Sequence, residues 1–108
     1  MDFWDKVIIE TEKTSTSFYD KNGRVISNGN KKAFAKIFTE QENKKSSYWV
    51  ATYNGVIYDP IGVNSNKERY LETKFKKVSK ETFDFYMIYL QTNNSIYLTR
   101  ANRRFIND

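Results

Sequence analysis

Near its C-terminal end the chain carries cationic and amide side chains at helical spacing. On a helix predicted over 95–106, four polar residues share one arc because each residue turns by about 100°. They are Arg100, Arg103, Arg104 and Asn107. A guanidinium group holds phosphate or guanine through paired hydrogen bonds, and an amide pairs with adenine. The arc therefore predicts DNA contact. The alternative is a plain surface helix whose cations suit the negative end of the helix dipole.

The opposite side of the same helix is apolar. Leu98, Ala101 and Phe105 fall on one stripe, so we expect the helix to bury that stripe and to present the polar arc to solvent.

A second cationic group lies in a loop-rich hairpin closer to the N-terminus. Its members are Lys21, Arg24, Lys31 and Lys32, and no acidic residue occurs between positions 21 and 36. A projecting hairpin with long cationic side chains can reach phosphates or enter a minor groove. The alternative is a turn that is merely solubilised by its lysines. The two groups support each other if folding brings them onto one side.

Aromatic residues cluster in a later hairpin that could itself bind nucleic acid. The rings belong to Tyr48, Trp49, Tyr53 and Tyr58. Exposed rings on a sheet stack with unpaired bases, which would make the protein a single-strand binder. Aromatic residues at strand spacing are more often core, and the sequence favours that interpretation because the predicted helices must pack on a sheet.

The sequence contains few residues of the types that act in catalysis or bind metals. The chain has no histidine and no cysteine, so the commonest general base and the thiolate nucleophile are missing. Two carboxylate pairs have the spacing of one helix face and could share a magnesium ion: Glu68 with Glu72, and Glu81 with Asp84. Each pair is flanked by Lys or Arg, so a salt-bridged surface is favoured. We expect no enzyme activity, no cofactor and no metal.

Length and composition predict one folded domain spanning residues 1–108. The chain is 39% hydrophobic and 17% aromatic, with a formal net charge of +5. Aromatic residues at this level can close a core in a short chain, and disordered chains lack them. Residues 1–12 do not resemble a signal peptide, and no apolar run is long enough to span a bilayer. These features predict a cytoplasmic protein without membrane contact.

The expected fold class is α+β, divided near Pro60 into a β-rich part (about 1–60) and a helical part (about 61–108). An antiparallel meander is expected first, with Asn-Gly turns at Asn22-Gly23 and Asn54-Gly55. Its strands are predicted over 6–12, 18–19, 24–27, 33–40, 48–53 and 56–59. About three helices should follow, over 67–77, 80–91 and 95–106, with Asn66, Ser79 and Asn94 or Ser95 as caps.

The last two predicted helices, with Thr92-Asn93-Asn94 between them and a glycine-turned hairpin elsewhere, resemble parts of a winged helix–turn–helix protein. The resemblance covers about half the chain and departs in order, because the hairpins precede the helices. It implies a winged-helix-like fold and duplex-DNA binding by the face with Arg100, Arg103 and Arg104. Small basic proteins of this kind serve plasmids and phages in replication, transfer or regulation.

Two functions from different classes follow. The first is a non-enzymatic accessory protein of a plasmid or phage that binds double-stranded DNA through the basic C-terminal helix and the basic hairpin. The second is a phage or plasmid inhibitor that binds a host defence protein by docking on an acidic surface of that protein or on its bound guide RNA. A homodimer is compatible with the first, since symmetric DNA sites usually call for two copies.

Overall fold

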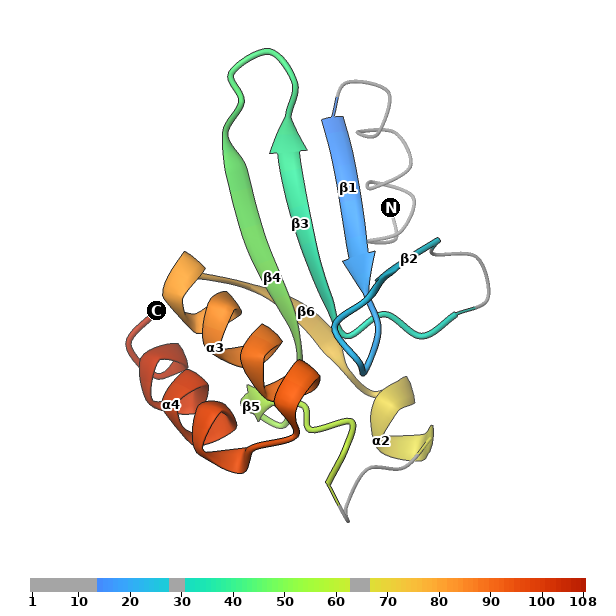
Figure 1. The fold of residues 1–108 in the computed structure, drawn as a ribbon, viewed down its shortest axis with the longest axis vertical. Coiled ribbons are helices and arrows are strands. Elements are labelled where there is room, and N and C mark those ends of the chain that lie inside the picture. The colour runs from blue at the N-terminus through green and yellow to red at the C-terminus, as the bar shows by residue number, and fades with distance from the viewer. Residues whose placement is uncertain (1–13, 28–30, 63–66) are drawn as a thin grey trace.

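The structure is a computed structural model that describes residues 14–27, 31–62 and 67–108, and it confirms the α+β class (Figure 1). An antiparallel sheet is followed by the helical part of the chain. The predicted strand over 6–12 and the proposed cap Asn66 lie outside the described residues. The strands are β1 (Thr14–Tyr19), β2 (Val25–Ile26), β3 (Ala35–Glu40), β4 (Ser46–Tyr53), β5 (Val56–Ile57) and β6 (Lys74–Val78). The helices are α2 (Lys67–Leu71), α3 (Lys80–Thr92) and α4 (Ser95–Phe105).

Strand β4 is the centre of the sheet. The strands follow the order β2-β1-β3-β4-β5, and β6 also pairs with β4. The hairpin from β4 to β5 turns at Asn54 and Gly55, whose φ angles of 55° and 82° are those that an Asn-Gly turn requires. The turn sets the register, because Tyr53 pairs with Val56 and the amide of Tyr58 donates to the carbonyl of Ala51.

One face of the sheet packs against α3. The ring of Phe83 lies 5.9 Å from the ring of Tyr19 and 5.2 Å from that of Tyr48, measured between centroids. Tyr86 and Leu90 of the same helix are buried in the core cluster. Tyr58 is buried in this cluster and the partly buried Tyr48 and Tyr53 pack against it, so the interpretation of the aromatic hairpin as core holds for these three rings.

The other face of the sheet contains a buried lysine. Alternation along β3 turns Lys36 away from α3, and its side chain is only 1% exposed. Its ammonium group lies 4.9 Å from the ring centroid of Trp49, 5.5 Å from that of Phe75 and 5.7 Å from that of Phe38. The aromatic rings of this face therefore surround a cation, which composition alone did not indicate.

The predicted helix over 67–77 is wrong in its second half. The chain is helical only from Lys67 to Leu71, and Lys74–Val78 forms strand β6 along β4. The apolar residues Phe75 and Val78 have a spacing that a helix would use, but β4 offers an unpaired edge there. Backbone groups of β4 need partners, and pairing with β6 supplies them.

Helices α3 and α4 begin where the sequence predicts. Ser79 caps α3, its hydroxyl accepting a hydrogen bond from the amide of Thr82, and the side chain of Asn94 accepts from the amide of Ile96 at the start of α4. Asn93, at a φ of 60°, closes α3 in the left-handed conformation. The apolar stripe of α4 is confirmed, because Ala101 is buried and Leu98 and Phe105 pack against the core.

The arrangement of α3 and α4 differs from a helix–turn–helix. The amide of Ser79, at the start of α3, donates to the carboxylate of Asp108, just beyond the end of α4 (3.2 Å). The start of one helix thus meets the end of the next, and the two run antiparallel, as Figure 1 also shows. Helices of a helix–turn–helix cross at about 90–120°. The geometry of α3 and α4 therefore does not support the resemblance to a winged helix–turn–helix protein.

Candidate nucleic-acid interface

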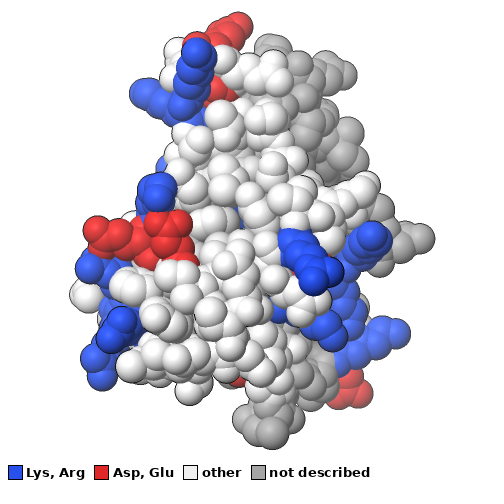
Figure 2. All heavy atoms as spheres, in the orientation of Figure 1, with Lys and Arg blue, Asp and Glu red and all other residues white. Residues whose placement is uncertain are grey.

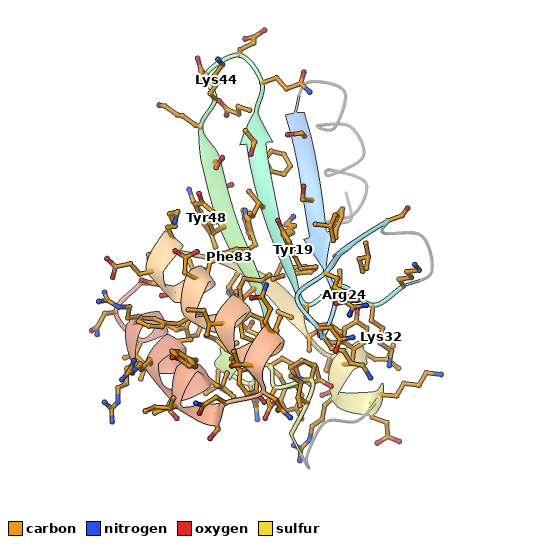
Figure 3. All side chains as sticks on the ribbon, viewed as in Figure 1. Tyr19, Arg24, Lys32, Lys44, Tyr48 and Phe83 are labelled. Atoms are coloured by element: carbon orange, nitrogen blue, oxygen red, sulfur yellow. The ribbon has the colours of Figure 1, made fainter. Side chains whose placement is uncertain are left out.

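The N-terminal cationic group lines a concavity of about 580 Å³, which we call the basic cleft. The turn between β1 and β2, the residues before β3 and helix α2 all contribute to its wall. Among the described residues, the cationic side chains that line it are Lys21, Lys31, Lys32 and Lys67, and the one lining carboxylate is that of Asp20. Figure 3 places Lys32 and Arg24 on this flank of the molecule.

The floor of the basic cleft is aromatic. Phe34 stacks on Tyr58 with a centroid distance of 5.9 Å and an interplanar angle of 10°. The ring of Tyr70 tilts against both, at 5.2 Å from Phe34 and 6.1 Å from Tyr58. Phe34 and Tyr58 are buried, whereas Tyr70 is half-buried. The cleft thus combines a cationic rim with a rigid ring cluster.

Tyr70 is held in place by its hydroxyl and carries a cation on its ring. The hydroxyl accepts a hydrogen bond from the amide of Ala33 (3.2 Å). Partial burial raises the pKa of the Tyr70 hydroxyl, and the hydrogen bond from Ala33 opposes that shift. The ammonium group of Lys32 lies 5.1 Å from the ring centroid, within the range of a cation–π contact.

A tight turn positions Lys21 and Arg24. The Oδ1 atom of Asp20 accepts hydrogen bonds from the amides of Asn22 (2.8 Å) and Arg24 (3.0 Å). Gly23 adopts a φ of +73°, and a Cβ there would lie 2.8 Å from Cγ of Gln91 on α3. The turn is therefore fixed by its own hydrogen bonds and by contact with the end of α3, so it is a local scaffold rather than a free loop.

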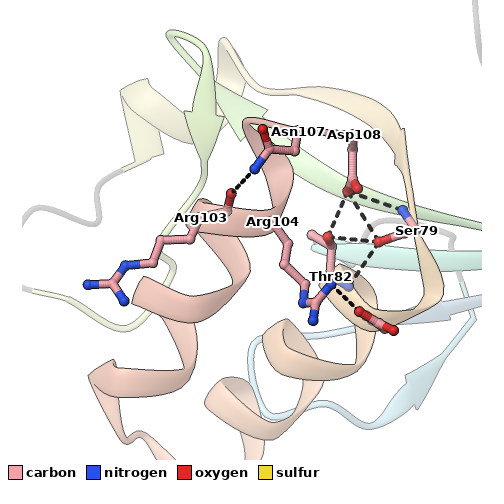
Figure 4. Close-up of polar contacts among 7 residues, drawn as sticks. Ser79, Thr82, Arg103, Arg104, Asn107 and Asp108 are labelled. Atoms are coloured by element: carbon pink, nitrogen blue, oxygen red, sulfur yellow. Dashed lines mark hydrogen bonds and ion pairs between the residues drawn. The ribbon is translucent and has the colours of Figure 1, made fainter.

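The polar arc of α4 is exposed, but its members are not equivalent. Arg104 forms an ion pair with Glu81 of α3 (Figure 4). Its guanidinium group also lies over the ring of Phe85, 5.9 Å from the ring centroid. The side-chain amide of Asn107 donates to the backbone carbonyl of Arg103 (3.3 Å). Arg104 and Asn107 are therefore partly engaged within the protein.

Two guanidinium groups of the arc have no ion pair among the described residues. Arg103 is exposed, and Arg100 lies over the ring of Tyr97 at 5.7 Å from its centroid. The ring of Tyr97 in turn stacks on Phe85 with a centroid distance of 6.5 Å. Contact of α4 with an anion would fall mainly to Arg100 and Arg103.

The fold does not bring the two cationic groups together. In Figure 2 one group lies on the flank formed by α4 and the other on the opposite flank, near β2 and α2. The surface between them is drawn almost entirely white. One short stretch of a linear polyanion on this face would meet one group or the other.

The acidic pair proposed for magnesium on α3 is used in ion pairs. Glu81 pairs with Arg104, and Asp84 pairs with Lys80 at 2.9 Å. Within residues 14–27, 31–62 and 67–108, no group of three or more ligating side chains could hold a metal ion.

A smaller hollow of about 260 Å³ contains Asp59 and Arg69. The carboxylate of Asp59 accepts from the amides of Ile61 (3.0 Å) and Gly62 (2.9 Å) and from the hydroxyl of Tyr89. Arg69 lies over the ring of Tyr53, 5.9 Å from its centroid. Asp59 ties the chain after β5 to α3, so this hollow is a structural junction.

Sequence reasoning found four members of the basic-cleft region and missed the rest. Lys21, Lys31 and Lys32 line the cleft, and Arg24 is exposed in the same turn without lining it. Lys67, Phe34 and Tyr70 were missed, and Tyr58 was named only as part of the aromatic hairpin. They come from three separate segments, and no local spacing links them.

Comparison with known proteins finds no family model, no curated protein and no solved structure that matches this chain. No helix in the described part of the chain is long and apolar enough to cross a membrane.

Proposed function

We propose that this protein is a non-enzymatic accessory protein that binds double-stranded DNA by its phosphate backbone, in the setting of a plasmid or phage. The basic cleft is the main contact in this proposal, with Arg24 beside it. Arg100 and Arg103 of α4 form a second contact, which reaches a different stretch of DNA because it lies on the opposite flank.

One observation carries the proposal: four lysines from three separate segments meet around one cleft, and the described residues add a single carboxylate to its lining. Gathering like charges in a concavity raises the energy of the folded protein, and a bound polyanion offsets that cost. Phosphate contacts of this kind hold DNA without reading its sequence, so the proposal concerns affinity and not a specific site.

The salt dependence of binding is the first test. With about four phosphate contacts, log K should fall with log salt at a slope of roughly −3.6. Affinity for duplex DNA should then drop about 150-fold between 50 and 200 mM salt. Fluorescence anisotropy with a labelled duplex measures this slope, and a flat salt dependence would contradict the proposal.

A pair of matched variants assigns the contact to the cleft. Lys31→Glu with Lys32→Glu should weaken duplex binding at least tenfold and lower the salt slope by about 1.8. The control is Lys44→Glu with Lys45→Glu, at the exposed tip of the β3–β4 hairpin, which Figure 3 places far from the cleft. Both double variants change the net charge equally. Equal losses in both would show that only overall charge matters.

The contribution of α4 is tested separately. Arg100→Glu with Arg103→Glu should reduce duplex affinity less than the cleft variant does, because these residues form the second contact. The same titration measures it, with circular dichroism to check the fold. A larger loss than in the cleft variant would move the main contact to α4.

A second function, inhibition of a host defence protein by direct binding, is favoured by one feature of the helical pair. Helices α3 and α4 leave Ile88 36% exposed and Ile96 46% exposed, and the Phe85–Tyr97 stack lies at their junction. Aromatic and arginine side chains are typical of protein-binding hot spots. Association through such a surface would persist at high salt, whereas DNA binding would not.

A further inference from the structure

The size of the basic cleft limits what can enter it. A volume of about 580 Å³ lies in the range of small-molecule sites, which is roughly 300–1,000 Å³. A duplex is too wide for such a space and can only lie across the rim. The ligand that fills the cleft is therefore one unit of a nucleic acid or a small molecule of similar size.

The floor offers one ring for stacking. Phe34 and Tyr58 are buried and stacked on each other, so they support the floor from beneath. Tyr70 is half-buried, lines the cleft and is braced by both neighbours and by the amide of Ala33. A braced aromatic ring stacks with a nucleobase at little entropic cost, because the ring is already ordered.

The rim offers the complementary charge. Three exposed lysines line the cleft together with Tyr70. Lys67 lies on the same helix as Tyr70, and Lys31 and Lys32 belong to the segment before β3. Lys32 now covers the ring of Tyr70 with its ammonium group. A base that stacks on that ring would displace the Lys32 side chain toward the phosphate. Lys32 would then contact the ring in the free protein and the phosphate in the complex.

We propose that the basic cleft takes a single unpaired nucleotide, with its base stacked on Tyr70 and its phosphate held by Lys31, Lys32 and Lys67. The nucleotide could come from two sources. The first is a single-stranded overhang of a DNA duplex, and for this source the inference rests on the proposed DNA binding. A free nucleoside phosphate has the same chemistry and is the second source.

The experiment uses 2-aminopurine, a fluorescent base whose emission falls when it stacks. The probe is placed in a short 3′ overhang of a duplex, at a paired position of a blunt duplex, or supplied as the free nucleoside triphosphate. With the wild-type protein we expect the overhang duplex to bind about tenfold more tightly than the blunt duplex, with loss of emission on binding. Quenching of the free triphosphate alone would assign the cleft to the second source.

Variants tie the signal to Tyr70. Tyr70→Leu should abolish the tenfold preference for the overhang and the emission change. Tyr70→Phe keeps the ring and should retain both. Tyr97→Leu, on the opposite flank, is the matched control and should behave as the wild type. Should Tyr70→Leu fail to fold, Lys67→Glu on exposed helix α2 should weaken overhang binding more than blunt-duplex binding.

The outcomes separate this inference from the proposed function. Equal affinity for overhang and blunt duplexes, or unchanged emission of every probe, would overturn the nucleotide site and leave the DNA-binding proposal standing. Absence of duplex binding with quenching of the free triphosphate would overturn DNA binding and leave the nucleotide site. Absence of any binding at low salt would overturn both.

Discussion

The contact between Asp108 and the start of α3 gives the sharpest stability prediction (Figure 4). The Oδ2 atom of Asp108 accepts hydrogen bonds from the hydroxyl of Thr82 (2.6 Å) and from the amide of Ser79 (3.2 Å). This carboxylate also lies at the positive end of the α3 dipole. Asp108→Ala removes these contacts, and the ion pair of Arg104 with Glu81 still joins the end of α4 to α3.

The expected cost is about 1–2 kcal/mol of unfolding free energy. Hydrogen bonds to a charged group contribute about 1.5–3 kcal/mol, but Asp108 is exposed, which reduces the value. Thr82 keeps a partner in the hydroxyl of Ser79 at 3.0 Å, so the loss stays moderate. Asp108→Asn keeps an acceptor and loses the charge, and it should cost about half as much.

Urea denaturation followed by circular dichroism measures the change. The midpoint should fall while the slope m stays constant, and the melting temperature should fall by about 4–8 °C per kcal/mol. Asn107→Ala is the control, since its amide only donates to the exposed carbonyl of Arg103, and it should remain within about 0.5 kcal/mol of the wild type. If Asp108→Ala is as stable as Asn107→Ala, the carboxylate does not stabilise the α3–α4 pair.

Two further predictions concern the core and the turns. Burial, and then the charge of Asp59, raises the pKa of the Tyr86 hydroxyl well above 10, so its contribution to stability is complete below pH 10 and declines as pH rises above it, by up to about 1.4 kcal/mol per pH unit. Urea midpoints between pH 8 and 11 measure this decline. Tyr86→Phe should make it less steep but not remove it, because the pKa values of the Tyr89 and Tyr70 hydroxyls are also raised; an equal slope in the variant would show that Tyr86 does not contribute. Gly55→Ala should cost about 1 kcal/mol because its φ is +82° with open space around it, whereas Gly23→Ala should cost more because its Cβ would also meet Gln91. Thermal melts of both variants test this order, and equal costs would mean that the side chain of Gln91 moves aside freely.

Local signals were sufficient wherever the deciding contacts are close in sequence. The caps at Ser79 and Asn94, the Asn-Gly turn at Asn54-Gly55 and the apolar stripe of α4 all lie within one turn or one hairpin of the groups they satisfy. Such hydrogen bonds and periodicities are set by neighbouring residues, so a single sequence is enough to predict them.

The prediction failed where two structures satisfy the same local pattern. Lys74–Val78 has apolar residues compatible with a helix or a strand, and only the open edge of β4 selects the strand. No local pattern predicts the burial of Lys36, a cation in a predicted strand that the fold places among aromatic rings. A long-range partner decided both cases.

In the candidate site, too, some features follow from the local sequence and others only from long-range contacts. The sequence by itself determined which side chains are cationic, that those of α4 share an exposed arc, and that a fixed turn presents Lys21 and Arg24, because these follow from residue type and local geometry. Only the tertiary structure decided that Lys67 joins the lysines of the hairpin over a floor of three rings, and that the arginines of α4 lie on the opposite flank. The physical reason is that a cleft forms between segments distant in the chain, and their approach depends on how the sheet and helices bury their apolar faces.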